Sequence, residues 1–137
     1  MALTMESKIV PRYAETDKMG VVYYANYLVW MEVGRTDYLA SLGFPYSQLE
    51  KEGVLFPVSA ARIKLHRPSY YEDKLIVSTV LESLRSRKVE FSYRVMRDGK
   101  LLVEGRTEHI CVNPEMKVRK IPAPLCEALR QSFNGAD

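Results

Sequence analysis

The residues most able to take part in a chemical reaction lie in the run RYAETDKMGVVYYANY, which begins at Arg12 and ends at Tyr27. Asp17 supplies a carboxylate on a short predicted turn, Gly20 follows it, and an apolar amphipathic segment then begins. A carboxylate can attack a carbonyl carbon or take a proton from water. The first N–H groups of a helix have no partners within the helix and can bind a developing oxyanion. This combination suits acyl transfer, whereas the simpler interpretation is a loop aspartate that caps a turn.

Length and composition describe an ordinary globular protein. The 137 residues are expected to form one domain, 1–137, that is long enough to build a hydrophobic core. Apolar residues make up 47%, charged residues 27%, and the net charge of +3 is too small to indicate a nucleic-acid-binding protein. Basic residues nevertheless cluster at 62–67, 85–88 and 117–120, which fits either solvated strand faces or a shallow phosphate site on the surface.

Nothing in the sequence indicates secretion, a membrane or a metal. The first five residues lack a basic start followed by an apolar run, and no apolar stretch approaches the roughly 20 residues that span a bilayer. Cys111 and Cys126 lie far apart in apolar contexts and have no metal-ligand spacing, so we expect buried thiols. The expectation is a cytoplasmic protein with no membrane insertion, no nucleic-acid partner and no metal site.

Hydrophobic periodicity predicts one long helix followed by a run of strands. A short first strand is predicted at 9–13, with Pro11 placing it at a sheet edge, and 15–21 are predicted as a loop. Apolar residues at helical spacing predict a helix at 24–42, capped by Asn26 or a neighbour and ended by Gly43. Beyond it we predict a short helix at 47–52, strands at 54–67, 74–84, 89–95 and 101–112, an Asp98-Gly99 hairpin turn, and a last helix at 122–133.

One long apolar helix against an antiparallel sheet predicts the α+β class. Gly34 lies midway along the helix, where the missing side chain permits close approach of a curved sheet. A small sheet leaves an exposed edge, and pairing between subunits often closes such edges. We therefore expect an obligate dimer.

The motif residues are similar in type and spacing to those of the 4-hydroxybenzoyl-CoA thioesterase family, and their positions here are Tyr13, Asp17, Gly20, Val22, Tyr27, Glu32 and Arg35. The order of helix and strands agrees over nearly the whole chain. The resemblance implies a hotdog fold, in which a curved antiparallel sheet wraps a long central helix. It also implies a homodimer that commonly pairs again into a homotetramer, and hydrolysis of acyl-CoA thioesters at sites between two subunits, with no cofactor.

The resemblance also implies roles for individual residues. Asp17 is the catalytic carboxylate, either as nucleophile or as the base that activates water, and the sequence leaves both open. Tyr24 matches the position whose backbone N–H polarises the thioester carbonyl, although some branches carry histidine there. Its alternative is a core tyrosine in the first helical turn. The expected substrate-binding residues are Tyr13, Gly20, Val21, Tyr27 and Met31 around the acyl group, and Arg87, Lys88 and Arg119 around the CoA nucleotide.

More than one role is conceivable for Glu32, His66 and Tyr13. Another branch of the hotdog superfamily uses a helical carboxylate as its catalytic group, and Glu32 lies on the predicted helix. Arg35 follows three residues later, so a helix-surface ion pair is the simpler interpretation and the one we favour. His66 has no visible metal partners and is taken as structural. Tyr13 either lines the pocket or is an ordinary strand residue.

The hypothesis is an acyl-CoA thioesterase that converts an acyl-CoA and water to a carboxylic acid and CoA. One alternative keeps the reaction but replaces CoA with acyl carrier protein. A second is a non-catalytic module that binds acyl thioesters, and a third is a structural subunit of a larger complex. Asp17 argues against the binding module, since a binder needs no carboxylate beside a carbonyl.

Overall fold

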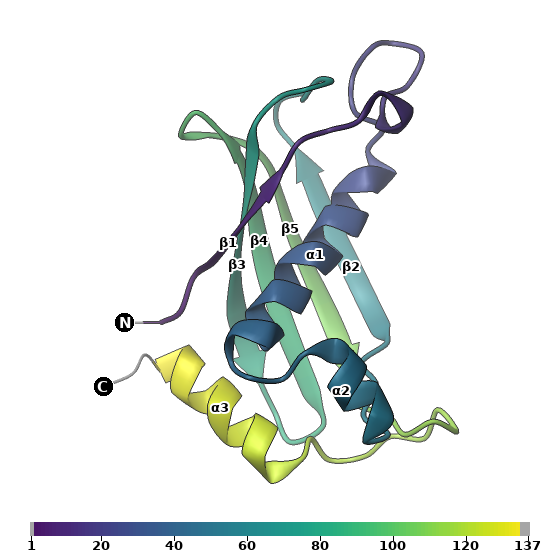
Figure 1. Cartoon of the computed structure of the whole chain (residues 1–137), viewed down its shortest axis with the longest axis vertical. Coiled ribbons are helices and arrows are strands. Elements are labelled where there is room, and N and C mark those ends of the chain that lie inside the picture. Colours follow the sequence, from purple (N-terminus) through teal and green to yellow (C-terminus); the bar gives the residue numbers. More distant parts are fainter. Residues whose placement is uncertain (1, 135–137) are drawn as a thin grey trace.

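A curved antiparallel sheet wraps one face of a long helix in the computed structural model, which describes residues 2–134 (Figure 1). The strands pair in the order β1-β3-β4-β5-β2, and every pair is antiparallel. The elements in chain order are β1 (Met5–Ile9), the 3-10 turn η1 (Tyr13–Glu15), α1 (Ala25–Ser41), α2 (Tyr46–Lys51), β2 (Val58–Leu65), β3 (Leu75–Leu84), β4 (Lys88–Arg97), β5 (Lys100–Ile110) and α3 (Ala123–Asn134). The predicted α+β class is confirmed.

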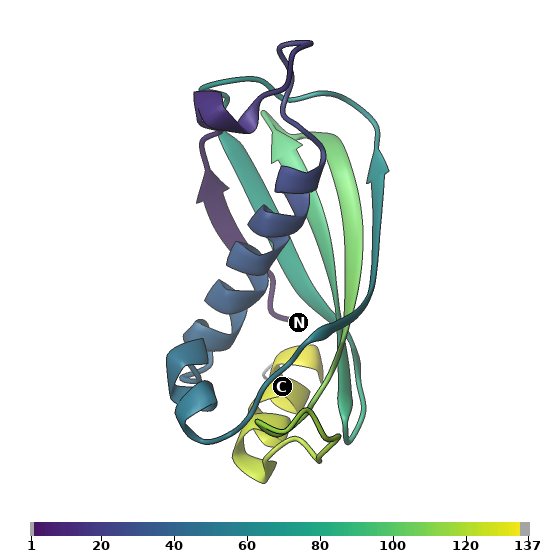
Figure 2. The ribbon, with the colours of Figure 1, turned by 90° about the vertical axis from the view of Figure 1, so that its right-hand side faces the viewer.

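The molecule has two distinct ends, which are named here for later use (Figure 2). The loop end holds residues 10–24, residues 66–74 and the β4–β5 hairpin. The α3 end holds α2, α3, the β3–β4 turn and residues 111–122. A strand of ten residues separates the two ends, which corresponds to roughly 30 Å.

Most predicted elements are present with shifted ends. The first strand occupies Met5–Ile9 and stops before Pro11, because residues 13–15 turn into η1. It is an edge strand, as predicted. Both residues of the Asp98-Gly99 turn have positive φ, 51° and 76°, as a two-residue hairpin requires. The strand predicted at 54–67 is shorter and begins at Val58, after Pro57.

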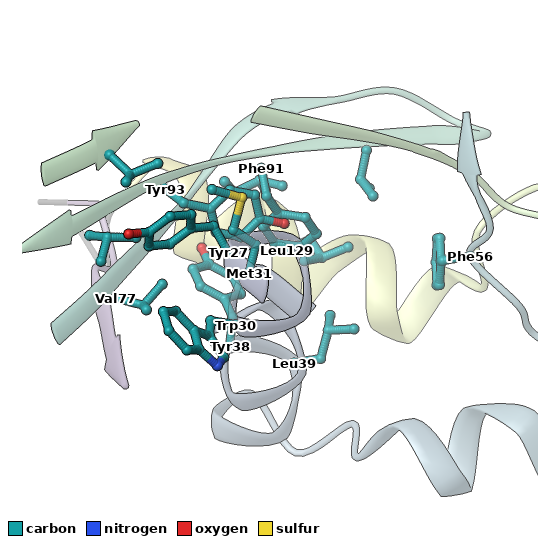
Figure 3. Packing of buried hydrophobic residues seen from close by; sticks show 14 of the residues in the cluster. Tyr27, Trp30, Met31, Tyr38, Leu39, Phe56, Val77, Phe91, Tyr93 and Leu129 are labelled. Carbon is teal, nitrogen blue, oxygen red and sulfur yellow. The ribbon is translucent and has the colours of Figure 1, made fainter. Parts of the chain in front are cut away.

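The core lies between α1, α3 and the inner face of the sheet (Figure 3). α1 crosses β3 so closely that a Cβ added at Gly34 would overlap Thr79 Oγ1 and lie 3.3 Å from Val77 Cγ1. The close approach predicted for Gly34 is therefore present. It brings Trp30 and Tyr38, one helical turn away on each side, into the buried cluster.

β2 is unusual among the strands because nearly all of its side chains are exposed. Its far edge has no neighbouring strand within the described residues. The outward side of α1 is also apolar and partly exposed at Leu28, Val29 and Val33. An unpaired edge beside an exposed apolar face is typical of a surface that another chain covers.

Candidate active site

Asp17 lies on a tight turn between η1 and α1. The Asp17 N–H donates to Val21 O at 2.8 Å, and the Gly20 N–H donates to Asp17 O at 2.9 Å. The carboxylate oxygen Oδ1 accepts the Met19 N–H at 2.8 Å. Gly20 has a φ of +83°, a left-handed conformation that glycine adopts without strain. One carboxylate oxygen therefore holds the turn, and among the described residues no hydrogen bond occupies the other.

Glu15 fixes this turn to the start of α1. Its buried carboxylate accepts the Arg12 backbone N–H at 2.7 Å, and the Arg12 guanidinium lies 3.4 Å away. Burial opposes ionisation, but the hydrogen bonds and charge of Arg12 prevail and hold the pKa of Glu15 below its usual value. The Glu15 carbonyl accepts the Tyr23 N–H and Asn26 Nδ2, each at 2.9 Å. Asn26 thus ties α1 to the turn, and of the two predicted positions for the N-cap, Asn26 or a neighbour, the structure uses the neighbour Tyr24.

Tyr24 is the N-cap residue of α1, and no side chain caps it. Within the described residues, no hydrogen bond occupies the Tyr24 N–H, whereas the Tyr23 N–H on one side is bonded to Glu15. The Tyr24 side chain is 52% exposed, and its ring packs against Tyr23 at a centroid distance of 5.0 Å. An open N–H at the positive end of a helix dipole is a suitable partner for an oxyanion.

A hollow of about 230 Å³ lies beside the start of α1. Val21, Tyr24 and Tyr27 line one wall, and residues 65–68, which run from the last residue of β2 into the loop after it, line the other. The Tyr27 ring is buried, and its hydroxyl lies 2.7 Å from Ser69 Oγ, so Tyr27 fixes the loop that follows β2. The structure thus gathers three predicted substrate-site residues in one loop-end hollow, next in sequence to the Asp17 turn.

Among the other predicted site residues, Asp17 and Gly20 lie on the turn and do not line this hollow, and neither do Met31 and Tyr13. Met31 is fully buried, and its side chain lies directly over Gly105 of β5, so it belongs to the core. Tyr13 is 76% exposed and packs edge-on against Tyr71, with ring centroids 5.8 Å apart. Tyr13 also lies in η1 and not in a strand.

The cations predicted to bind CoA gather at the α3 end, far from the Asp17 turn. The Cys111 N–H donates to Arg87 O and the Arg119 N–H donates to Cys111 O, each at 2.9 Å, so these segments lie side by side. Lys88 pairs with Glu108 at 2.9 Å. Within one chain, therefore, the predicted carboxylate and the predicted nucleotide contacts lie at opposite ends of the sheet.

A second cavity, of about 400 Å³, lies at the α3 end between α1 and the sheet. We call it the α3-end cavity. Residues from six elements line it: Glu32, Arg35, Thr36, Leu39, Tyr46, Phe56, Pro57, Val58, Val89, Phe91, His109 and Leu129. In Figure 3, Phe56 lies apart from the tight cluster around Met31, and Leu39 and Leu129 lie on the side of the cluster that is nearer to it.

A buried hydrogen-bond chain forms part of the floor of this cavity. His109 Nδ1 lies 3.1 Å from Phe56 O, which can only accept, so Nδ1 carries the proton. His109 Nε2 then accepts from Thr107 Oγ1 at 2.8 Å, and Thr107 accepts from the Tyr93 hydroxyl at 2.6 Å. Burial, with the nearby charge of Arg35, lowers the pKa of His109 to about 4, so the ring is neutral at pH 7. Its inward position on β5 and its contact with Thr107, two residues earlier, follow from strand alternation, but its contact with Phe56 joins segments that are distant in sequence.

Glu32 and Arg35 form a weak pair at the rim of the α3-end cavity. Arg35 Nη2 lies 3.9 Å from Glu32 Oε2, and the Arg35 side chain is only 17% exposed whereas that of Glu32 is 67% exposed. The favoured helix-surface ion pair is present at this distance. Within a single chain, the Glu32 carboxylate is exposed to solvent and does not lie in a buried catalytic site.

Comparisons with known proteins identify the family of the chain. A family model described as the thioesterase-like superfamily matches residues 11–131. The chain belongs to the thioesterase-like superfamily. Among curated relatives, a Bacillus subtilis protein named "Putative acyl-CoA thioesterase YneP" is 45% identical over 111 residues, which is 80% of each chain. The acyl-CoA thioester hydrolase YbgC of Escherichia coli is 31% identical over 121 residues, covering 87% of this chain and 90% of that protein.

Solved structures of the superfamily show the same fold. The hypothetical protein TT1821 from Thermus thermophilus superposes with a TM-score of 0.89 at 40% identity, covering 92% of this chain and 97% of that one. The DHNA-CoA thioesterase from Staphylococcus aureus gives 0.88 at 33% identity, covering 96% and 93%. The predicted hotdog fold is confirmed, and this thioesterase-like protein is an enzyme of the thioester-hydrolase class.

Two structural features of the protein concern metal ions and membranes. Across residues 2–134, His, Cys, Asp and Glu side chains do not gather in threes as metal ligands would. No helix in that part of the chain has the length and apolar character needed to cross a membrane.

Proposed function

We propose that this protein hydrolyses acyl-CoA thioesters to a carboxylic acid and CoA, with Asp17 as the catalytic carboxylate and the Tyr24 N–H as the oxyanion donor. The observation that supports the proposal is that Asp17 and the Tyr24 N–H lie in one short segment between η1 and α1, which Glu15 fixes in place. Glu15 holds the turn, and within residues 2–134 one Asp17 carboxylate oxygen and the N–H at the adjacent helix start have no hydrogen-bond partner. The relatives named as acyl-CoA thioesterases support acyl-CoA as the substrate. Such a protein is expected in the cytoplasm.

Asp17 could catalyse thioester hydrolysis by either of two mechanisms. As a base, it takes a proton from water while the water oxygen attacks the thioester carbonyl, and the C–S bond then breaks to release CoA thiol and acid. As a nucleophile, its open oxygen attacks the carbonyl, CoA thiolate leaves, and water then hydrolyses the mixed anhydride. In both routes the negative charge develops on the carbonyl oxygen, where the Tyr24 N–H stabilises it. The motif residues also support the narrower 4-hydroxybenzoyl-CoA type of site.

The proposed functional unit is a homodimer joined through β2, and two such dimers would form a tetramer. Antiparallel pairing of β2 with its copy would place the Val58 end of one chain beside the Leu65 end of the other. The α3-end cavity and cations of one chain then approach the Asp17 turn of its partner. This arrangement accounts for the separation of the predicted site residues within one chain. A stable, active monomer in light scattering at micromolar concentration would contradict it.

The test of the catalytic assignment is Asp17→Asn. The asparagine keeps an oxygen that can accept the Met19 N–H, so the turn should remain. We expect unchanged thermal unfolding and a loss of kcat on the order of 10²–10⁴. Glu32→Gln is the matched control, since it neutralises the competing carboxylate on α1. Wild-type turnover in Asp17→Asn together with an inactive Glu32→Gln would overturn the assignment.

The same assay separates CoA from the alternative carrier. Matched acyl groups on CoA and on acyl carrier protein are compared at equal concentration. The proposal expects the larger kcat/KM for the CoA thioester. A clear preference for the carrier-protein thioester would replace CoA as the assigned substrate, and no turnover of either would favour the non-catalytic binding module.

A further inference from the structure

Residues 66–74 join two strands that are not neighbours in the sheet. They lead from β2 to β3, and β5 and β4 lie between these two strands. The segment therefore crosses the ends of β5 and β4, which it does at the loop end of the molecule (Figure 2). It also meets the Asp17 turn there, because the Val22 N–H donates to Ser69 O at 2.8 Å. One loop thus connects the end of the sheet to the proposed catalytic turn.

Val22 lies at the base of the Asp17 turn and joins the turn to Ser69. Val22 and Thr16 form an antiparallel bridge that closes the turn, and the hydrogen bonds of this bridge come from their neighbours in sequence. The Val22 N–H takes no part in the bridge and donates to Ser69 O instead. Val22 is 4% exposed and Ser69 is fully buried, so water does not compete for this bond. The position of the turn therefore depends on the position of Ser69.

Ser69 also anchors the first turn of α1. Its hydroxyl lies 2.7 Å from the Tyr27 hydroxyl, and both side chains are buried. Burial raises the pKa of Tyr27, so the Tyr27 hydroxyl keeps its proton at pH 7. Tyr27 follows Tyr24 by three residues, which is nearly one turn of the helix. Ser69 thus contacts both parts of the proposed site. Its carbonyl holds the Asp17 turn, and its hydroxyl holds the helix that carries the Tyr24 N–H.

Arg97 and Asp73 fix the residues on both sides of Ser69. Arg97 ends β4, and its Nη1 donates to Asp73 Oδ2 at 2.6 Å and to Pro68 O at 3.4 Å. The same Asp73 oxygen accepts the Tyr70 N–H at 2.8 Å. Pro68 and Tyr70 are the neighbours of Ser69 in sequence. The ion pair therefore binds one backbone group on each side of the buried serine.

The surroundings of this ion pair restrict it to one arrangement. Surface pairs between mobile side chains contribute little, because both side chains lose conformational freedom when they meet. The Arg97 and Asp73 side chains are only 28% and 21% exposed, and the guanidinium carbon lies 5.8 Å from the centre of the Tyr70 ring. The ring, the loop backbone and the strand end hold both groups in place. The pair can therefore transmit a fixed position from β4 to the loop.

We infer that Arg97 and Asp73 are positioning residues for the proposed reaction, because they hold Ser69 and thereby place the Asp17 carboxylate beside the Tyr24 N–H. This inference deepens the proposed function and rests on it, since Asp17 must be the catalytic group for its position to matter. Displacing a catalytic group by about 1 Å can lower a rate about 10²-fold. A loosened loop should therefore lower kcat, whereas KM should stay nearly constant because the predicted nucleotide contacts lie elsewhere.

The first experiment measures kcat and KM for Arg97→Met, Arg97→Lys and Asp73→Asn at a temperature where each variant is fully folded. The substrate is the acyl-CoA that the wild type hydrolyses fastest in a panel from acetyl- to palmitoyl-CoA with phenylacetyl-CoA. We expect Arg97→Met to lower kcat about 10- to 100-fold and to change KM by less than about twofold. Asp73→Asn keeps an oxygen for the Tyr70 N–H but loses the charge, so its loss of kcat should be smaller. Arg97→Lys keeps the charge without the planar fork and should restore part of kcat.

Arg106→Met is the matched control. The Arg106 guanidinium pairs with Glu82 at 3.3 Å and with Glu90 at 3.7 Å, and these contacts do not involve residues 66–74. Its removal deletes an arginine and its ion pairs from the same sheet without touching the loop. We expect kcat and KM to equal those of the wild type. Wild-type kcat in both Arg97→Met and Asp73→Asn, or equal losses in Arg97→Met and Arg106→Met, would overturn the inference.

The Asp17→Asn background separates positioning from stability. If Arg97 acts by placing Asp17, Arg97→Met should lower kcat by less than about threefold once Asp17 is already replaced. Its effect on Tm should be similar in both backgrounds, because the ion pair is lost in each. Equal fold-losses of kcat in the two backgrounds would mean a general effect on the fold and would overturn the positioning role. Undiminished turnover in Asp17→Asn would instead refute the proposed function.

The second experiment does not depend on turnover. Hydrogen exchange of the Val22 amide is followed by NMR in the intact protein, since this N–H reports directly on the bond to Ser69 O. We expect exchange about fivefold faster or more in Arg97→Met and in Asp73→Asn, and no change in Arg106→Met. If Val22 responds in this way but no thioester is hydrolysed, the proposed function fails and the link from the ion pair to the turn stands. Unchanged Val22 exchange in both loop variants would overturn the inference whatever the activity.

Discussion

The contact between Gly34 and Thr79 offers a sharp test of how α1 sits on the sheet. A Cβ at position 34 would overlap Thr79 Oγ1, and it would lie 3.3 Å from Val77 Cγ1 and 3.5 Å from Thr79 Cβ. To relieve the overlap, α1 must move away from β3 by roughly 1 Å. Overpacking costs about 1–3 kcal/mol, an overlap with a buried and stiff β-branched side chain lies in the upper part of that range at about 2–3 kcal/mol, and the better helix propensity of alanine recovers about 1 kcal/mol. We expect Gly34→Ala to lose about 1–2 kcal/mol of unfolding free energy, with a fall in Tm of about 3–8 °C.

The partner substitution makes the test specific. Thr79 Oγ1 is buried and has no hydrogen-bond partner among the described residues, so its removal leaves no group unsatisfied. In the Thr79→Ala background the remaining contacts of an alanine at position 34 begin at 3.3 Å, which is tight but tolerable. The double variant should therefore be more stable than Gly34→Ala alone when the four proteins are compared by denaturant unfolding. Equal stability of the double and single variants, or an unaffected Gly34→Ala, would refute the close approach of helix and sheet.

Three other outcomes follow from the site. Glu15→Gln should lower kcat at least tenfold and lower Tm, because the loss of charge weakens the Arg12 bonds that hold the Asp17 turn; unchanged kinetics would deny Glu15 that role. His109 has a pKa of about 4 in the folded protein against an ordinary 6.5, so the unfolded state binds the proton at a higher pH than the folded state does. The free energy of unfolding should therefore fall by up to about 3 kcal/mol as the pH drops from about 6.5 to about 4. Unfolding measured across this pH range should lose that part of its pH dependence in His109→Gln. Arg87→Ala and Arg119→Ala should raise KM for acyl-CoA several-fold and leave kcat unchanged. For a truncated thioester without the nucleotide, KM and kcat should both stay unchanged. Equal losses of kcat/KM on both substrates would assign the two arginines to the fold.

Local patterns in the sequence predicted an element well where its structure depends mainly on its own residues. The helical spacing of Tyr27, Trp30 and Tyr38 follows from burial along one face of α1. The Asp98-Gly99 turn follows from backbone preference alone. The first strand was harder to place because Pro11 can end a strand as well as lie in one, and the structure uses it as the end.

The candidate site was predictable only in part, since much of it depends on contacts between distant segments. The Asp17 turn is local, and its motif identified it. Met31 was predicted to face the substrate, but it packs on Gly105, which lies 74 positions later and reaches it only through the sheet register. The bond of His109 to Phe56 O joins residues 53 positions apart, next to the point where the β2–β5 register shifts, whereas its bond to Thr107 is local to β5. Short-range sequence patterns carry no information on such pairings.

The separation of Asp17 from Arg87 and Arg119 by the length of the sheet has a consequence for inheritance. In the proposed pair, each complete site takes its carboxylate from one chain and its nucleotide contacts from the other. A chain that lacks Asp17 and a chain that lacks Arg87 would then assemble one site with both defects and one site with neither. An allele that is inactive because it lacks Asp17 and an allele that binds substrate weakly because it lacks Arg87 could therefore together produce an intact site, because the gene's unit of function is divided between two copies of its product.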